Sequence, residues 1–130
     1  MFDFKNTNGE SFGNVRYVYK DSKGDIWIGG LEGLWRYDRN IIIHYSKDPV
    51  GYILEDKHQN IWVSRNKGYN EGWGLVYYEK AVLYDKVPSV HEIHSGEVMI
   101  FGIEEDQKGD IWFGTSDGAR RYDGKSIVRF

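Results

Sequence analysis

The sequence predicts an all-β chain that forms three four-stranded blades of a β-propeller. Composition is the first observation behind this prediction, because the 130 residues include 16 Gly but 2 Pro, together with 5 Trp, 10 Tyr and 6 Phe. Glycine favours tight turns, whereas aromatic side chains favour strands. The second observation is a block of sequence that occurs three times, and the third is the division of each copy into four short strand-like segments.

The repeated block begins with an aspartate and carries a tryptophan six positions later. It occurs at residues 21–30, 56–65 and 106–115. A second block follows each copy, and its final aromatic residue is Tyr37, Tyr78 or Tyr122. The tryptophan and this tyrosine lie 10 positions apart in the first and third copies but 16 apart in the second. The second copy therefore contains six extra residues around positions 67–72, and a further insertion of nine follows near positions 90–94.

Each copy contains four short segments rich in aromatic and β-branched residues, separated by turn residues. In the first copy the predicted strands are residues 15–20, 25–29, 34–37 and 41–45. In the second copy they are residues 52–54, 60–64, 74–78 and 81–84. In the third copy they are residues 98–104, 110–114, 119–122 and 126–130. In the first and third copies, the first connection (residues 22–24 and 107–109) contains a glycine and follows an aspartate that can accept hydrogen bonds within its own turn. No segment shows a convincing helical period.

Four-stranded units whose tryptophans lie 35 and 50 residues apart are typical of a β-propeller. A β-helix would need a shorter repeat, and a β-sandwich would need no repeat at all. We therefore place the blades at about residues 14–46, 50–85 and 97–130 of a single propeller segment. Residues 1–5 resemble the outermost strand of a preceding blade, so we expect an extra outer strand there.

Three blades are fewer than the roughly four to eight that propellers contain. An arc of three blades leaves two apolar faces open to solvent, which favours association. Two chains joined head to tail would close a ring of six blades, so the sequence predicts a homodimer. The alternative is that the chain is a piece of a larger protein.

The third copy carries the most regular form of the motif. It reads Glu-Asp-Gln-Lys-Gly-Asp-Ile-Trp-Phe-Gly-Thr over residues 105–115 and Arg-Tyr-Asp-Gly over residues 121–124. This pattern resembles the repeat of the two-component regulator propeller family. The first copy departs from it at Gly30, and the second departs at residues 64–65. The three copies together extend the resemblance over nearly the whole chain.

The resemblance implies a propeller that acts as a ligand-sensing domain in signal transduction. Such domains are typically the periplasmic sensors of hybrid histidine kinases that respond to carbohydrates, so a small molecule or a saccharide is the expected ligand. The family suggests the periplasm, whereas the N-terminus of this chain shows no secretion signal. A more distant similarity to streptogramin lyase implies a lyase-type enzyme as the alternative function, and a structural fragment of a larger sensor is a third interpretation.

Composition argues against several other classes of protein. The net charge of -3, without a basic run, argues against a nucleic-acid partner. The absence of Cys excludes disulfides and thiolate catalysis, and the longest apolar run, residues 41–43, is far too short for a membrane helix. The sequence shows no nucleophile motif and no phosphate-binding glycine loop. We therefore expect a non-enzymatic module without a cofactor.

The repeated aromatic residues are expected to fill the space between blades rather than to bind a ligand. The tryptophans at equivalent positions are Trp27, Trp62 and Trp112. The same interpretation applies to the tyrosines of the second block, Tyr37, Tyr78 and Tyr122. Aspartates recur at residues 21 and 25 and at residues 106 and 110, but a spacing of four and Asn60 in the second copy favour turn formation over calcium binding.

The predicted ligand site is the insertion between residues 65 and 73, where the second copy departs from the repeat. Its candidate ligand-binding residues are Tyr69, Asn70, Glu71 and Trp73. Insertions in repeat proteins form loops on one face, and loops often carry function. Aromatic rings beside amide and carboxylate groups would suit a sugar, although a loop that contributes only to local packing is the alternative.

His91 and His94 are the weak candidates for a metal site, with Glu97 as a third group. They are not the helical H-E-x-x-H motif, and in a regular strand residues three apart face opposite sides. A solvated loop is the alternative interpretation. A lyase-type site would need histidines converging from different blades, for which His44 and His58 are also available.

Overall fold

The computed structural model describes residues 13–68 and 71–130, and it confirms an all-β chain. Within these residues, three antiparallel sheets of four strands follow one another along the sequence. The first comprises β1 (Val15–Lys20), β2 (Ile26–Gly30), β3 (Gly33–Tyr37) and β4 (Ile42–Ser46). The second comprises β5 (Val50–Glu55), β6 (Ile61–Asn66), β7 (Trp73–Tyr78) and β8 (His91–Gly96). The third comprises β9 (Ile100–Glu105), β10 (Ile111–Thr115), β11 (Gly118–Tyr122) and β12 (Ile127–Arg129). The outer strand expected at residues 1–5 lies outside the described residues.

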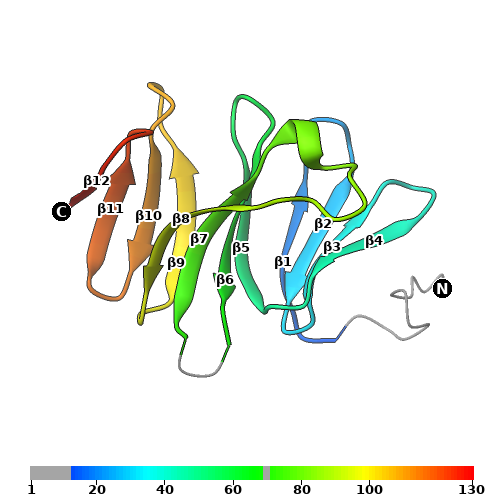
Figure 1. Ribbon diagram of the computed structural model, residues 1–130, viewed down its shortest axis with the longest axis horizontal. Coiled ribbons are helices and arrows are strands. Elements are labelled where there is room, and N and C mark those ends of the chain that lie inside the picture. Colours follow the sequence, from blue (N-terminus) through cyan, green and yellow to red (C-terminus); the bar gives the residue numbers. More distant parts are fainter. Residues whose placement is uncertain (1–12, 69–70) are drawn as a thin grey trace.

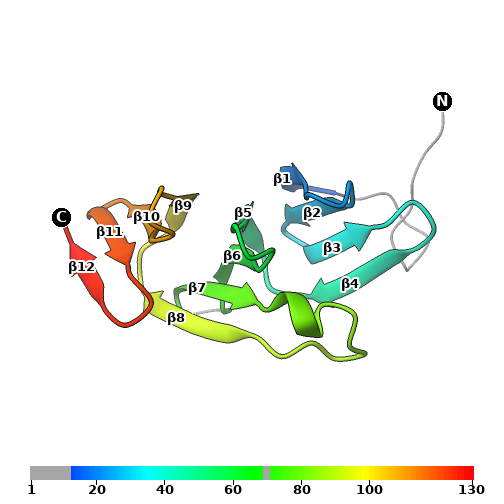
Figure 2. The same cartoon turned by 90° about the horizontal axis from the view of Figure 1, so that it is seen from above.

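The three sheets stand side by side as blades in a curved arc (Figures 1 and 2). Each blade is a simple meander, so its strands are neighbours in the order in which the chain makes them. The first strands of the blades, β1, β5 and β9, contact one another in sequence along one side of the arc. The fourth strands, β4, β8 and β12, form the other side (Figure 2).

The second blade differs from the prediction in its fourth strand. Residues 81–84 do not form a strand, because the chain turns through the 3-10 helix η1 (Lys80–Val82) after β7. The fourth strand is β8 instead, which pairs with β7, so this blade extends to residue 96 rather than to about 85. No helix in the described part of the chain is long and apolar enough to cross a membrane.

The side chain of Asn60 explains why the predicted strand fails. Its Oδ1 accepts a hydrogen bond from the backbone N–H of Lys80 at 3.0 Å, and this contact starts the turn. The β-favouring residues that follow are then used for packing against the first blade instead of for strand pairing.

The core consists of two clusters, one in each junction between blades. Trp27 is fully buried in the first cluster, against Val50 and Ile53 of the second blade. Trp62 takes the same place in the second cluster, against Ile100 and Ile103 of the third blade. The apolar side chains of each junction therefore come from both faces that meet there, and each blade needs its neighbour to bury them.

The same network of hydrogen bonds organises the first turn of every blade. In the first blade, Asp21 Oδ2 accepts the indole N–H of Trp27 at 2.9 Å, while Oδ1 accepts the backbone N–H groups of Lys23 and Asp25 at 2.9 and 3.0 Å. We call this arrangement the Asp–Trp clasp. It ties the turn after the first strand to the tryptophan of the second strand.

The other two blades repeat the Asp–Trp clasp with nearly identical geometry. The indole N–H groups of Trp62 and Trp112 lie 2.9 Å from the carboxylates of Asp56 and Asp106. The hydrogen bond from Trp112 is the largest of several that lower the pKa of Asp106. Of the aspartates that resembled calcium ligands, Asp21 and Asp106 therefore act within their own turns.

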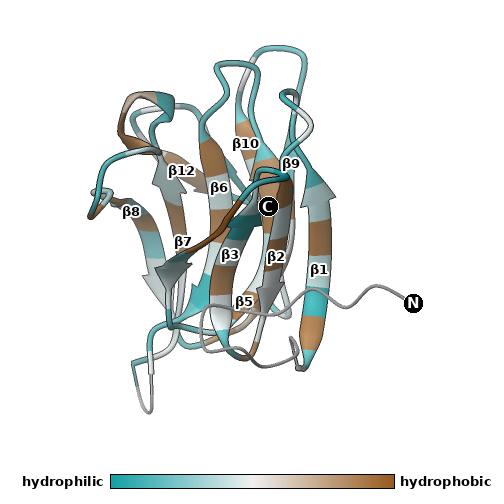
Figure 3. Ribbon diagram, turned by 90° about the vertical axis from the view of Figure 1, so that its right-hand side faces the viewer, coloured by the Kyte–Doolittle hydropathy of each residue, from teal (hydrophilic) through white to brown (hydrophobic). Residues whose placement is uncertain are grey.

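The two ends of the arc expose apolar side chains. Val18 is 60% exposed, whereas Ile53 and Ile103, at the same position of the following blades, are 0% and 2% exposed. Figure 3 looks onto this end of the arc and shows hydrophobic segments along β1 and β2. At the other end, Phe101 and Phe130 are also exposed. These faces lack the neighbour that the internal junctions have.

We expect Asp56→Ala to destabilise the fold by about 2–4 kcal/mol, because it leaves the Trp62 indole N–H and two backbone N–H groups without an acceptor. Urea unfolding followed by tryptophan fluorescence measures this change. Asp85→Ala, at an exposed loop position, is the matched control and should cost less than about 0.5 kcal/mol. Equal costs for the two variants would contradict the role given to the clasp.

Candidate ligand site between the first two blades

A buried arginine lies behind the clasp of the first blade. Arg36, on β3, is 1% exposed, and its Nε lies 3.7 Å from the Asp25 carboxylate. Its guanidinium carbon lies 5.5 Å from the ring centroids of both Trp27 and Tyr45. The aromatic rings and the carboxylate offset part of the cost of removing this cation from water, while Arg36 Nε and Nη2 have no hydrogen-bond partner among the described residues.

The third blade repeats this arrangement at its open face. Arg121 Nε lies 3.8 Å from the Asp110 carboxylate, and the guanidinium stands over the rings of Trp112 and Phe130. Arg121 is 35% exposed, because no further blade covers it. The pairing of aspartate with arginine is therefore a property of the repeat rather than of one junction.

The second blade replaces both partners of this ion pair together. Asn60 stands where the other blades have aspartate, and Tyr77 stands where they have arginine. Tyr77 stacks on Trp62 with ring centroids 4.6 Å apart. Because the site no longer needs a carboxylate to balance an arginine, the Asn60 side chain is free to hold the backbone of Lys80. In the second blade, Asn60 therefore holds the start of the insertion that follows β7.

This insertion, residues 79–90, crosses from the second blade to the first, and we call it the strap. Leu83 is buried in the first core cluster, and its carbonyl accepts a hydrogen bond from the Tyr45 hydroxyl at 2.6 Å. Burial raises the pKa of Tyr45 to about 12, so its hydroxyl remains a donor at neutral pH. Tyr84 covers Arg36 with its ring centroid 4.3 Å from the guanidinium carbon.

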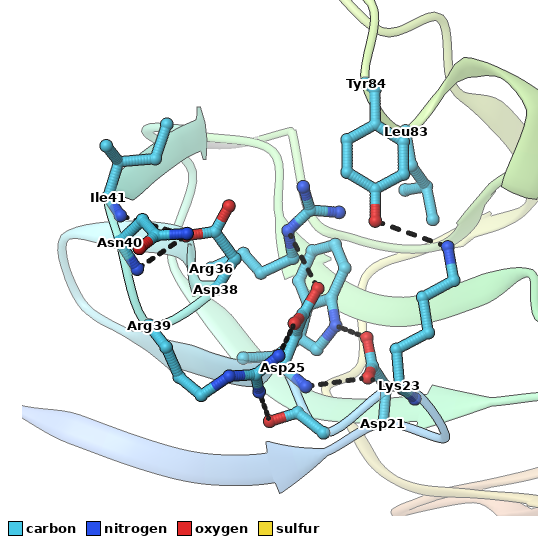
Figure 4. Close-up of polar contacts among 12 residues, drawn as sticks. Asp21, Lys23, Asp25, Arg36, Asp38, Arg39, Asn40, Ile41, Leu83 and Tyr84 are labelled. Carbon is cyan, nitrogen blue, oxygen red and sulfur yellow. Dashed lines mark hydrogen bonds and ion pairs between the residues drawn. The ribbon is translucent and has the colours of Figure 1, made fainter.

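The strap is also joined to the turn of the first blade. Lys23 Nζ donates a hydrogen bond to the Tyr84 hydroxyl at 3.2 Å, as Figure 4 shows. In the same view, Arg39 reaches Asp25 from the other side, where their charged atoms lie 3.6 Å apart. Three cationic side chains therefore surround one carboxylate and one tyrosine at this edge of the blades.

An open depression of about 660 Å³ lies beneath the strap. Its lining residues are Lys23, Asn60, Tyr77, Glu79, Lys80, Ala81 and Tyr84. Two tyrosine rings, an amide, a carboxylate and two ammonium groups converge there, which offers stacking surfaces together with hydrogen-bond donors and acceptors. His91 stands beside this site, since its Nε2 lies 3.2 Å from Glu79 and its ring stacks on Tyr77.

The loop predicted as the ligand site lies elsewhere. Figure 1 shows the ends of β6 and β7 that lead into it on the opposite side of the blade from η1. Glu71 is exposed in a turn, and Trp73 is half-buried against Gly51 at the start of β7. Tyr69 and Asn70 lie outside the described residues. The sequence did not predict the depression under the strap. A signal was present, because the second copy is the one of the three in which Asn60 and Tyr77 replace the aspartate and the arginine of the ion pair.

The two histidines proposed as weak metal candidates face the same side of β8. A bulge at residue 93 brings His91 opposite Tyr77 and His94 opposite Leu75, instead of on the opposite faces expected for a regular strand. His94 packs against Phe113 of the third blade, with ring centroids 5.2 Å apart. In residues 13–68 and 71–130, no group of three or more His, Cys, Asp or Glu side chains is placed to hold a metal ion.

The remaining histidines lie apart from this strand. His44, on β4 of the first blade, stacks on Trp35 with ring centroids 3.7 Å apart. His58 lies in the turn between β5 and β6, where its backbone N–H takes part in the clasp of Asp56. The structure therefore distributes the four histidines over an outer strand of the first blade, a turn and β8.

Comparison with known proteins supports the interpretation of the repeat. The profile of the two component regulator propeller family matches residues 9–32 and 95–117, which include the blocks of the first and third copies. The predicted resemblance to this family is confirmed by that match. No curated protein matches the sequence.

Two solved structures share the fold. One is the extracellular domain of the putative hybrid two component system BT4673 from B. thetaiotaomicron, with a TM-score of 0.74 over 98% of this chain at 20% sequence identity. The other, described as the extracellular domain of a putative one component system BT4673 from B. thetaiotaomicron, has a TM-score of 0.72 over 92% of this chain at 20% identity. The chain spans 18% of the length of either solved chain. At this identity the likeness concerns the fold, which is that of propeller blades.

We expect His94 to make the fold less stable in mild acid. Burial, followed by the nearby charge of Arg120, lowers the pKa of His94 below its usual value of 6.5. The unfolded chain therefore binds this proton more readily, so the stability that neutral His94 provides is lost as the pH falls below about 6.5. Urea unfolding of the wild type at pH 7 and pH 5 should show a larger loss than the same comparison for His94→Gln, and equal losses would contradict this assignment.

Proposed function

We propose that this chain, whose first and third repeats match the two component regulator propeller family, is a non-enzymatic sensing module that binds a small ligand under the strap. The observation that carries the proposal is the depression of about 660 Å³ at the place where the second blade departs from the repeat. A feature that every blade shares serves the fold, whereas a feature present in one blade is available for specificity.

The chemistry of the lining supports a saccharide as the ligand. The rings of Tyr77 and Tyr84 offer apolar surfaces on which a sugar can stack. Asn60, Glu79 and the lysines supply both donors and acceptors for hydroxyl groups. Lys23 and Lys80 against the single Glu79 also favour a ligand that carries a carboxylate or sulfate group over a cationic one.

We propose that the position of the strap also couples ligand binding to signalling. It touches the first blade through Leu83 and Tyr84 and the second through Asn60, so a ligand beneath it contacts residues of both blades. Within a longer protein of the hybrid two component type, we propose that the occupied site biases the relative position of these blades. The exposed apolar side chains at the ends of the arc support association with another blade.

Binding of a panel of neutral and acidic oligosaccharides, measured by isothermal titration calorimetry, tests the proposal. Lys80→Ala removes a charged side chain from the site but keeps the backbone N–H that Asn60 holds, and Tyr84→Ala removes a stacking ring. We expect each variant to weaken binding about tenfold. Lys86→Ala, an exposed strap position outside the lining, is the matched control and should bind like the wild type.

Trp73→Ala separates this site from the loop predicted by the sequence. If Trp73→Ala weakens binding while Lys80→Ala does not, the ligand binds at the loop of residues 65–73, and the proposal that it binds under the strap is contradicted. If no oligosaccharide of the panel binds the wild type, the saccharide class is wrong. Thermal unfolding of each variant shows whether a loss of binding reflects a loss of folding.

A further inference from the structure

A glutamate crosses each junction between blades and contacts the first turn of the preceding blade. Glu55 accepts the backbone N–H of Ser22 at 2.9 Å and the Ser22 hydroxyl at 3.0 Å. At the next junction, Glu105 accepts the backbone N–H of Lys57 at 2.9 Å. Both glutamates immediately precede the aspartate of a clasp, so we call them the junction glutamates. Each therefore joins its blade to the turn of the blade before it.

The first blade has a lysine where the other two have a junction glutamate. Lys20 pairs with Ile26, just as Glu55 pairs with Ile61 and Glu105 with Ile111. It is exposed, and no carboxylate in the described part of the chain forms an ion pair with it. An ammonium group has donors but no acceptor, so Lys20 cannot receive the turn N–H that a junction glutamate receives.

The apolar part of the same face keeps the pattern of the internal junctions. Val15 and Val18 stand at the positions of Val50 and Ile53, which are buried against the first blade. They are 41% and 60% exposed. The apolar part of this face therefore matches the internal junctions between blades. The charge at its edge differs in sign, because Lys20 stands where the other blades have a glutamate.

The far face of the third blade also keeps the apolar features of a junction. In the internal junction, a Cβ placed on Gly29 would lie 2.7 Å from Val50, so this glycine makes room for the next blade. Gly114 occupies the same position in the third blade and has no atom of another residue within 4 Å of such a Cβ. Apolar shape alone would therefore permit the third blade of one copy to receive the first blade of another.

The polar groups at the edge of this face disfavour the same contact between two copies. In that head-to-tail contact, Lys20 would meet the turn of residues 106–109, where the backbone N–H of Gln107 corresponds to those of Ser22 and Lys57. Two donors would then face each other, and Lys108 adds a further positive charge to this turn. Facing groups of the same kind reduce affinity for a wrong partner, which is how many interfaces acquire specificity.

We propose that the end face formed by Val15, Val18 and Lys20 docks a partner propeller blade that carries a carboxylate in its first turn, and that Lys20 disfavours the third blade of a second copy. The carboxylate would stand at the turn position of Ser22 and Lys57. Side chains at this position reach the neighbouring blade, since the Ser22 hydroxyl contacts Glu55 and accepts from Gln59 Nε2 at 3.2 Å. An aspartate or glutamate there would reach Lys20.

Four forms of this chain test the proposal by their self-association, measured by sedimentation velocity over micromolar concentrations. Lys20→Glu restores a junction glutamate, and Gln107→Glu places a carboxylate in the turn that Lys20 would meet. We expect each single variant to self-associate about tenfold more tightly than the wild type. The double variant, in which two carboxylates face each other, should return to the weak association of the wild type.

Comparing the self-association of the four forms distinguishes recognition by charge from association through apolar surface alone. If the wild type already forms a dimer as tight as that of Lys20→Glu, a second copy is the occupant of this face and the proposal is overturned. Equal association of all four forms, at any strength, also overturns it, because Lys20 would then have no role in partner choice. Circular dichroism of the four forms confirms that each is folded before the comparison is made.

Discussion

The carboxylate of one aspartate organises each blade, because it binds the turn and the tryptophan at once. In the first blade, Asp21 holds two backbone N–H groups with one oxygen and the indole of Trp27 with the other. The ring is thereby oriented toward the next blade, where it is fully buried in the junction. The turn is also placed where a junction glutamate of the next blade can reach its N–H. The first turn, the buried tryptophan and the contact between blades are all connected to this one group.

The candidate site lies where the second blade differs in sequence from the other two blades. The second blade keeps the clasp of Asp56 and Trp62 but replaces the aspartate–arginine pair by Asn60 and Tyr77. A buried arginine needs a carboxylate, so exchanging one partner alone would leave an unbalanced charge. With both exchanged, the amide can hold the strap, and the strap closes over Arg36 of the neighbouring blade. A new surface is therefore made without loss of the framework.

The threefold block predicted the blades because its tryptophan and aspartate have a local partner at constant spacing. The strand at residues 81–84 was predicted wrongly, since strand propensity cannot register that Asn60, twenty residues earlier, holds Lys80 in a turn. The depression under the strap needs contact between two blades, which no local pattern contains. Lys20, in contrast, was visible in the sequence as the position before the aspartate, and its meaning came from the hydrogen bonds of Glu55 and Glu105.

Hydrogen exchange of the tryptophan indole N–H groups, followed by NMR, tests the clasp most directly. The structure predicts that the indole protons of Trp27, Trp62 and Trp112 exchange much more slowly than in the unfolded chain, because each is bonded to a carboxylate. Trp112 is the most informative of the three, since its clasp lies in the blade without a following neighbour. Exchange of these three protons at the rate of the unfolded chain would contradict the account.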